Sequence, residues 1–292
     1  MSKIEDQYLH TFSPTGMWGD QILTLFSCHY HMLNMGKKGI IIHTSKDLFE
    51  THHDRFVNTE KDILKFWSTF EFIKGIIFDV DQRTLPTDAA VSNYNIFPYL
   101  DFPYNDDYQC NLAEHIDFSL FPKRFNQNLD SNYKTAILQP VSLKNKPVAL
   151  KNDFIAEWDE SVAELIKKGY WIYMIGSDED SQILREIHDS KLSSFTDKSQ
   201  VTNLMGRLDM FESIDLVMNK ADFVMSCCSW SGWYGIASRK KTAMAIGPLM
   251  EEGKTDRAYV NCMKNKDIFF MDYSSKKEET DKNIARWIKD NV

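Results

Sequence analysis

Two short apolar segments in the second half of the chain, KTAILQ at 134–139 and YWIYMI at 170–175, decide the fold. Both contain β-branched or aromatic residues, and the second ends at a glycine, which is typical of buried strands. Between them, residues 152–168 repeat apolar side chains every three or four positions, which predicts a helix. A strand, a helix and a second strand in this order predict parallel strands joined by a helical crossover.

The alternation of strands and helices continues on both sides of these segments. Towards the C-terminus, we expect helices at 178–190, 211–219, 232–238 and 278–291 and strands at 223–227 and 242–246. Towards the N-terminus, we expect strands at 8–13, 39–43 and 75–80, helices at 20–35 and 59–72, and loops with short helices beside a cleft at 84–132. This spacing favours an α/β fold built on parallel sheets.

The length of 292 residues suits two domains of ordinary size. With 43% hydrophobic and 26% charged residues, each half has enough apolar side chains for its own core. We predict a first Rossmann-like domain at 1–133 and a second at 134–275. The last helix, at 276–292, is expected to pack back toward the first domain.

The charge and the cysteines narrow the class of protein. A net charge of −8 disfavours non-specific binding of nucleic acids, which requires a surplus of Lys and Arg. The five cysteines form no C-x-x-C pair, which favours a reducing compartment. No leader pattern and no apolar stretch of about 18 residues is present, so we expect a soluble cytoplasmic protein.

Small and polar residues follow the first predicted strand, in the part of an open α/β fold where ligands bind. Gly19 lets a ligand approach the backbone, and Asp20 stands at the start of the predicted helix. Asp20 is therefore a candidate general base for a hydroxyl nucleophile. The alternative is that Asp20 is only the N-cap of the helix.

A second group follows the strand at 134–139. Ser142, Lys144 and Lys146 offer a hydroxyl and two cations, which suit the phosphates of a bound donor. Lys146 would stabilise a departing diphosphate by its charge. The alternative is a solvated loop.

Two further groups follow predicted strands and open predicted helices. Gly176 and Ser177 could contact a nucleotide, and Glu179 could receive a ribose or base; the alternative is a capped helix with an acidic first turn. Ser231 and Gly232 form a turn suited to phosphate. The adjacent aromatic residues, Trp233 among them, could stack on a sugar or base, and the alternative is core packing.

The histidines do not form a metal-ligand pattern. Asp79 and Asp81, at the end of a predicted strand, are weak candidates for binding a metal. We therefore predict no metal site and no metal requirement.

The order of these motifs resembles that of the bacterial heptosyltransferase family, which transfers a sugar from an ADP-sugar to lipopolysaccharide core. The likeness is good in the second half and thin at 45–130. It is carried by GDQIL at 19–23, Ser142 with Lys146, GYWIYMIGSDE at 169–179, LMG at 204–206, WSGWYG at 230–235 and GP at 247–248. It implies a GT-B fold of two facing Rossmann-like domains, Asp20 as the base, and a donor site that also includes Met205.

The sequence departs from the family at four of these positions. Val141 replaces a hydroxyl residue, Glu179 comes one residue early, Trp230 replaces an aspartate and Gly235 replaces a histidine. The last two family residues serve the donor site, so their replacement indicates a different nucleotide sugar, a different donor pose or lost activity. The chain is also shorter than typical members, which indicates a trimmed acceptor domain.

The resemblance implies a glycosyltransferase that uses a UDP- or ADP-sugar as co-substrate and needs no other cofactor. The acceptor is either a glycan or a hydroxymethylated base in phage DNA, so the setting is a bacterium or a phage-infected cell. A DNA acceptor predicts a basic strip of Lys37, Lys38, Lys123 and Arg124 beside the first-domain cleft. A non-catalytic sugar-nucleotide-binding protein and a GT-B-type sugar-nucleotide epimerase remain alternatives. The oligomeric state stays open.

Overall fold

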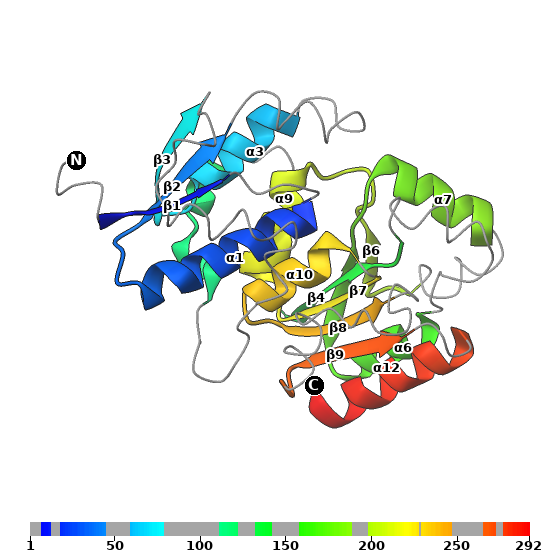
Figure 1. Cartoon of the computed structure of the whole chain (residues 1–292). Coiled ribbons are helices and arrows are strands. Elements are labelled where there is room, and N and C mark those ends of the chain that lie inside the picture. Colours follow the sequence, from blue (N-terminus) through cyan, green and yellow to red (C-terminus); the bar gives the residue numbers. More distant parts are fainter. Residues whose placement is uncertain are drawn as a thin grey trace. The chain divides into compact units, whose positions relative to one another are not determined.

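The computed structural model divides the chain into two compact units, Met1–Leu120 and Phe121–Val292, each with its own sheet (Figure 1). This division lies 13 residues before the boundary that we predicted at residue 133. The structure describes residues 7–12, 18–44, 59–78, 111–121, 132–141, 158–188, 198–227, 229–246, 265–272 and 277–292.

The first unit contains a parallel sheet in the order β1 (Leu9–Phe12), β2 (Ile40–Thr44) and β3 (Ile73–Phe78). Helix α1 (Trp18–Asn34) connects the first two strands, and α3 (Thr59–Ser68) connects the second and third. Because α1 ends beside the amino ends of the strands, its first turn lies towards their carboxyl ends.

The segment before the boundary packs against this sheet through short helices, as expected for part of 84–132. These are the 3₁₀ helices η5 (Leu112–His115) and η6 (Phe118–Leu120). Backbone hydrogen bonds from Asp117 N to Thr69 O (2.9 Å) and from Glu71 N to His115 O (2.9 Å) hold the segment against the turn before β3.

The second unit contains six parallel strands in the order β6-β5-β4-β7-β8-β9. The chain starts in the middle of this sheet, builds outward on one side and then crosses to build outward on the other. That order is the one of the dinucleotide-binding Rossmann fold. The strands are β4 (Lys134–Gln139), β5 (Tyr170–Met174), β6 (Val201–Asn203), β7 (Phe223–Cys227), β8 (Lys241–Ile246) and β9 (Ile268–Asp272).

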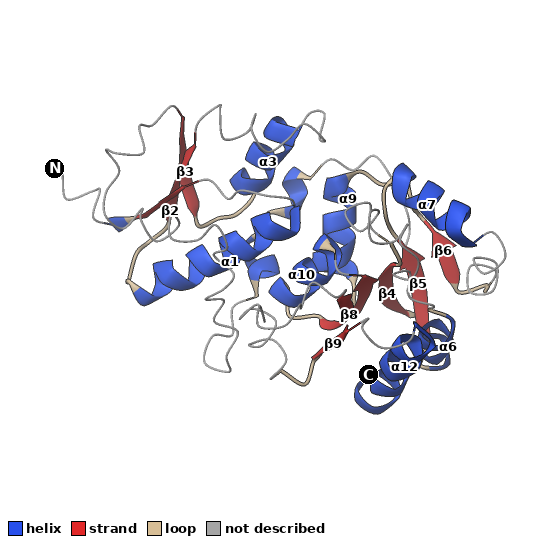
Figure 2. Cartoon of the chain, turned by 45° about the vertical axis from the view of Figure 1, so that its right-hand side comes forward, coloured by secondary structure: helices blue, strands red, loops and turns tan. Residues whose placement is uncertain are grey.

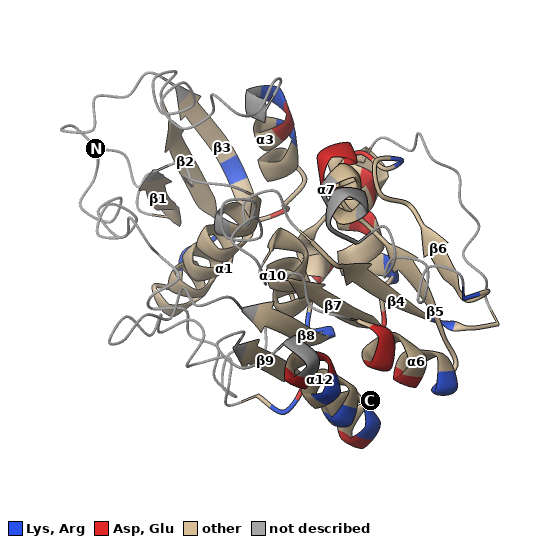
Figure 3. Cartoon of the chain, turned by 90° about the vertical axis from the view of Figure 1, so that its right-hand side faces the viewer, with Lys and Arg blue, Asp and Glu red and all other residues tan. Residues whose placement is uncertain are grey.

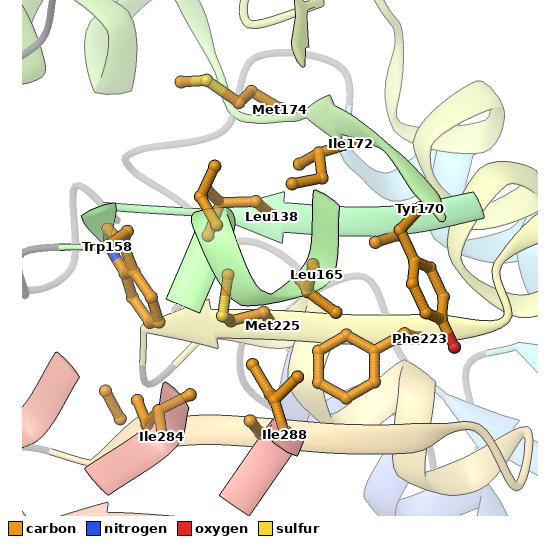
Figure 4. Packing of buried hydrophobic residues seen from close by; sticks show 14 of the residues in the cluster. Leu138, Trp158, Leu165, Tyr170, Ile172, Met174, Phe223, Met225, Ile284 and Ile288 are labelled. Carbon is orange, nitrogen blue, oxygen red and sulfur yellow. The ribbon is translucent and has the colours of Figure 1, made fainter. Parts of the chain in front are cut away.

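Helices cover both faces of this sheet (Figure 2). One face packs on α6 (Asp159–Lys167), α7 (Asp178–His188) and α12 (Lys277–Asn291), through an apolar core that includes Leu138, Leu165 and Ile288 (Figure 4). The other face packs on the π-helical turn η8 (Leu216–Lys220) and on α10 (Trp230–Ala237), and α9 (Met210–Asp215) contacts η8. Alternate residues of each strand serve the two faces.

The structure confirms most of the predicted elements, although it places β6 and β9 where the sequence analysis predicted no strand. The last helix begins at Lys277 and contributes Ile284 and Ile288 to the core of the second unit. Its predicted approach to the first domain stays a prediction.

The last helix also caps α6. Trp158, which precedes α6, offers no side-chain cap. Instead, the Asp281 carboxylate accepts hydrogen bonds from Glu160 N (2.8 Å) and Ser161 N (2.9 Å), and also from Ser161 Oγ. A residue distant in sequence thus satisfies backbone donors that the first turn of a helix leaves unpaired.

Replacing Asp281 by alanine should therefore lower the free energy of unfolding by about 2–3 kcal/mol, because one buried and one partly buried N–H group lose their acceptor. Asp290→Ala is the matched control, since Asp290 is an exposed aspartate on the same helix. Urea denaturation of the full chain measures both. Equal effects of the two variants would show that Asp281 caps nothing.

The cost of Asp281→Ala should also depend on pH. Burial raises the pKa of Asp281 from 3.8 to about 6, although hydrogen bonds from Ser161 and Glu160 lower it. This folded-state pKa lies above the unfolded value, so the protonated form of Asp281 is the one that folding favours. The contribution of this pKa difference to the free energy of unfolding is therefore complete below about pH 4 and is lost as the pH rises through about 6. The cost of the substitution should therefore be smaller at pH 7 than at pH 4, and a cost that grows with pH would contradict this.

Candidate functional site

The strand order of the second unit places its switch point between β4 and β7. In open α/β sheets, ligands bind outside the carboxyl ends of the strands at this point. The strands are all parallel, so the residues that follow β4, β5, β6 and β7 meet at one edge. Gly176 and Ser177 follow β5, Met205 follows β6 and Ser231 follows β7, so this edge includes four predicted site residues.

Two buried polar atoms mark the switch point, and the sequence analysis missed one of their residues. Gln139 Oε1, at the end of β4, and Ser231 Oγ, in the first turn of α10, have no hydrogen-bond partner within the described part of the chain. Gln139 is 1% exposed and Ser231 is 0% exposed. Leaving such groups unpaired is costly, so their position at the ligand-binding edge indicates a polar ligand.

Helix α10 lies very close to the sheet, on the face that includes Gln139 and Ser226, which are register partners. A Cβ on Gly232 would lie 2.7 Å from Ser226 Oγ and 2.1 Å from Met244 Cε. A Cβ on Gly235 would lie 2.8 Å from Thr242 Oγ1. Glycine at both positions therefore brings the start of α10 onto the end of β7.

The start of α10 can bind an anion. Its N-cap residue, Ser229, makes no side-chain cap hydrogen bond, and the helix contains no charged residue (Figure 3). The first backbone N–H groups of a helix have no partner inside the helix and carry a partial positive charge. Phosphate or another anion fits this position, as the sequence analysis proposed for Ser231 and Gly232.

The turn after β5 shows the capped helix that the sequence analysis kept as an alternative. Ser177 N donates to Asp180 Oδ2 (2.9 Å), and Asp180 N donates to Ser177 Oγ (3.1 Å). Ser177 and Glu179 are exposed, so capping leaves both side chains accessible to a ligand. Gly176 adopts φ +155°, and its carbonyl accepts from Gly206 N (2.8 Å).

Two predicted contact residues have buried side chains. Met205 is 6% exposed and belongs to the apolar core. Trp233 is 7% exposed and contacts Phe270 of β9, with ring centroids 6.1 Å apart. A donor contact through either side chain would require the core to open. Trp230, in contrast, is half-buried at the start of α10, so the structure favours Trp230 over Trp233 as the aromatic contact.

Several predicted residues lie outside the described residues. They include Ser142, Lys144 and Lys146, although the end of β4 that leads to them is described. There, Trp158 Nε1 donates to Pro140 O (3.3 Å) and Val141 is buried.

Arg207, in the turn after β6, is an exposed cation at the ligand-binding edge that was not predicted from the sequence. Asp79 and Asp81 also lie outside, and in the described ranges no cluster of three His, Cys, Asp or Glu could hold a metal.

In the first unit, Gly19 and Asp20 lie in the first turn of α1, which begins at Trp18. Asp20 is therefore inside the helix and not its N-cap; its side chain is not described. The Trp18 and Phe66 rings contact each other at 5.5 Å, and Trp67 Nε1 donates to Gln21 Oε1 (3.1 Å). These two contacts with α3 fix the turn that carries the predicted base.

Two groups of histidines lie in the first unit. His10 Nδ1 and His43 Nε2 are 2.7 Å apart, and both residues are buried on neighbouring strands. Burial and, to a smaller extent, the nearby His115 lower the pKa of His29 from 6.5 to about 4, and Glu71 opposes this change. His29 is therefore a neutral core residue near neutral pH.

The structure does not support the predicted basic strip for DNA. Lys37 and Lys38 lie in the turn between α1 and β2, and Lys38 N donates to Gln7 O beside the amino end of β1 (2.7 Å). In the sheet of the first unit, this is the end opposite to the carboxyl ends of the strands, where open α/β folds bind ligands. Lys123 and Arg124 lie outside the described residues.

No described helix is long and apolar enough to cross a membrane.

Comparisons with known proteins identify the fold. No protein-family model matches the chain, and no curated protein matches it in sequence. A glycosyl transferase family 9 structure from Veillonella parvula matches with TM-score 0.55 and 9% identity over 97% of each chain. Two structures of E. coli heptosyltransferase WaaC each match over 98% of this chain and 100% of that one. The structure with ADP matches with TM-score 0.53 and 11% identity. The structure with ADP-2-deoxy-2-fluoro heptose matches with TM-score 0.50 and 10% identity.

The chain has the fold of these glycosyltransferases. This confirms the predicted α/β class with two parallel sheets, and it agrees with the GT-B fold expected from the motifs. At 9–11% identity the likeness concerns the fold alone, so the activity must be argued from the site.

The turn after β6 allows a test of the site's backbone geometry. Gly206 has φ +72°, and a Cβ there would lie 1.9 Å from Asp178 Oδ1. Gly169 has φ +80° with nothing within 4 Å of a Cβ. Gly169→Ala should therefore cost only about 1 kcal/mol of backbone strain, whereas Gly206→Ala should cost about 2–3 kcal/mol. Urea denaturation compares them, and equal costs would show that the close contact with Asp178 is absent.

Proposed function

We propose that this chain is a glycosyltransferase that moves a sugar from a nucleotide-sugar donor to an acceptor hydroxyl. The observation that carries the proposal is a pair of buried polar atoms at the switch point of the second unit, Gln139 Oε1 and Ser231 Oγ, which have no hydrogen-bond partner among the described residues. They lie at the end of β4 and the start of α10, where an anion-binding helix terminus meets the ligand-binding edge. The fold shared with glycosyltransferase family 9 supports the same assignment.

The donor binds on the second unit in this proposal. Its diphosphate receives hydrogen bonds from the first N–H groups of α10, near Ser231 and Gly232, and charge from Lys144 and Lys146. Ser142 adds a hydroxyl donor. The nucleoside lies along the turn after β5, where Gly176 permits close approach and exposed Ser177 and Glu179 offer polar groups. WaaC has been solved with ADP and with ADP-2-deoxy-2-fluoro heptose, which supports an ADP-sugar; a UDP-sugar is the other candidate.

The transfer step needs a base and a charge that stabilises the leaving group. Asp20 removes the proton of the acceptor hydroxyl while that oxygen forms a bond to the anomeric carbon. The bond from this carbon to the phosphate oxygen breaks, and the nucleoside diphosphate leaves with both electrons. Lys146 and the start of α10 stabilise its charge, so the proposed mechanism requires no metal.

For the acceptor, we propose a glycan. The position of Lys37 and Lys38 at the opposite end of the first sheet gives no support to a DNA acceptor. Hydroxymethylated DNA is therefore tested as a second acceptor. Donor turnover without an acceptor would indicate an epimerase, and donor binding without any turnover would indicate a sugar-nucleotide-binding protein.

Donor binding can be tested by thermal shift with ADP-glucose, UDP-glucose and GDP-mannose. One of them should raise the melting temperature of the wild type, because a ligand at a hundred times its dissociation constant stabilises a protein by about 2.7 kcal/mol. Lys146→Ala should remove most of this shift. Lys167→Ala, an exposed lysine on α6 paired only with Glu164 (3.1 Å) among the described residues, should leave it unchanged. No shift with any nucleotide sugar would contradict the donor site.

The base can be tested by release of nucleoside diphosphate in the presence of an acceptor. Asp20→Asn should lower kcat by about 10²–10⁴, the usual contribution of general base catalysis. The thermal shift with the donor should stay unchanged, because Asp20 belongs to the first unit. Asp62→Asn, on α3, is the control. Full activity of Asp20→Asn would remove Asp20 from the mechanism.

A further inference from the structure

Trp230 is the aromatic residue that the ligand-binding edge leaves accessible. It is the first residue of α10 and is half-buried, whereas Trp233 and Tyr234 of the same helix are buried. The rings of Trp230 and Tyr234 meet at 86° with centroids 5.4 Å apart. Tyr234 is 0% exposed and therefore holds the indole in place.

The edge-to-face contact leaves part of the indole available. In such a contact the edge of one ring lies on the face of the other, so Tyr234 covers at most one face of Trp230. Among the described residues, no other ring contact or hydrogen bond of Trp230 is present. Part of the indole is therefore accessible beside the start of α10.

The residues next to Trp230 in the first turn of α10 are uncharged. Ser231 Oγ is the next side chain, and the first turn of α10 contains no acidic residue. Figure 3 shows acidic residues at the start of α7 and none on α10. A ligand here receives hydrogen bonds for an anionic group and, next to it, an aromatic face for an apolar surface. A diphosphate joined to a sugar ring has both parts in this order.

We propose that Trp230 determines which sugar the donor carries, by stacking its indole face on the C–H face of the ring attached to the diphosphate. The inference rests on the proposed function and adds the residue that recognises the sugar. The face of an indole is negative, and the C–H groups of a sugar are weakly positive, so the contact is attractive. A carboxylate at this position would instead select hydroxyl groups by hydrogen bonding.

This proposal separates recognition of the sugar from recognition of the nucleotide. Calorimetric titration with ADP and ADP-glucose, UDP and UDP-glucose, and GDP and GDP-mannose gives the ratio of the two dissociation constants for each nucleotide. For the pair that the wild type binds, Trp230→Ala should reduce the advantage of the sugar-bearing ligand about tenfold, as expected for loss of one aromatic contact. The affinity for the nucleoside diphosphate alone should stay unchanged.

Two variants control for folding and for the loss of a large side chain. Trp230→Phe keeps an aromatic face and should keep most of the sugar's advantage. Trp287→Ala removes a half-buried tryptophan that stacks on Phe269 at 5.5 Å, on the face of the sheet opposite to α10. It should lower the melting temperature and leave the ratio unchanged.

The outcomes distinguish the inference from the proposed function. If the wild type binds neither the diphosphates nor their sugars, the proposed function fails, and the inference fails with it. If binding is retained and Trp230→Ala changes the affinity for both ligands equally or for neither, the donor site stands and the role of Trp230 is overturned. A loss confined to the sugar-bearing ligand in Trp230→Ala supports the inference.

Discussion

The close packing of α10 on β7 and β8 is the constraint on which the rest of the candidate site depends. Gly232 and Gly235 allow it, because a Cβ at either position would lie within 3.0 Å of Val224, Ser226, Thr242 or Met244. With larger residues either the helix or these side chains would have to shift, which would disturb the position of the first N–H groups of α10 at the end of β7. The same packing buries Ser231 and places it next to the sheet face that includes Gln139. The anion binding proposed for this edge thus depends on two glycines.

The apolar surroundings of Gln139 Oε1 and Ser231 Oγ raise the free-energy cost of leaving these two atoms without a hydrogen bond. Strands β4 and β7 pair along their length, and β7 is buried at every residue, so water is excluded there. In such surroundings an unpaired amide or hydroxyl oxygen costs more free energy than at the surface. A ligand that supplies a hydrogen bond would recover this energy. Ser177 and Asp180 differ in this respect, because they satisfy each other and leave only exposed groups to a ligand.

Much of the fold could be predicted from the sequence, because it follows from local patterns. The runs at 134–139 and 223–227 each contain three consecutive apolar residues, AIL and FVM, and the structure has strands with these bounds. Strand β6 has only three residues and β9 follows a long segment without a pattern, so periodicity could not identify them. The site was harder to predict. Trp230 and Trp233 both follow β7, and only the start of α10 and its packing decide that Trp233 faces the core.

The departures from the heptosyltransferase motif have a physical explanation in this helix. At position 235 that family has a histidine, but here a side chain would meet Thr242 Oγ1 at 2.8 Å and Val224 Cβ at 3.0 Å. Gly235 therefore belongs to the packing of α10 and cannot simply be replaced by the family residue. Trp230, five residues earlier, lies at the accessible end of the same helix. Trp230 can stand at the start of this closely packed helix because its half-buried side chain does not occupy the buried position of Ser231. Trp230 and Gly235 are thus compatible with each other and with the close packing of α10 on the sheet.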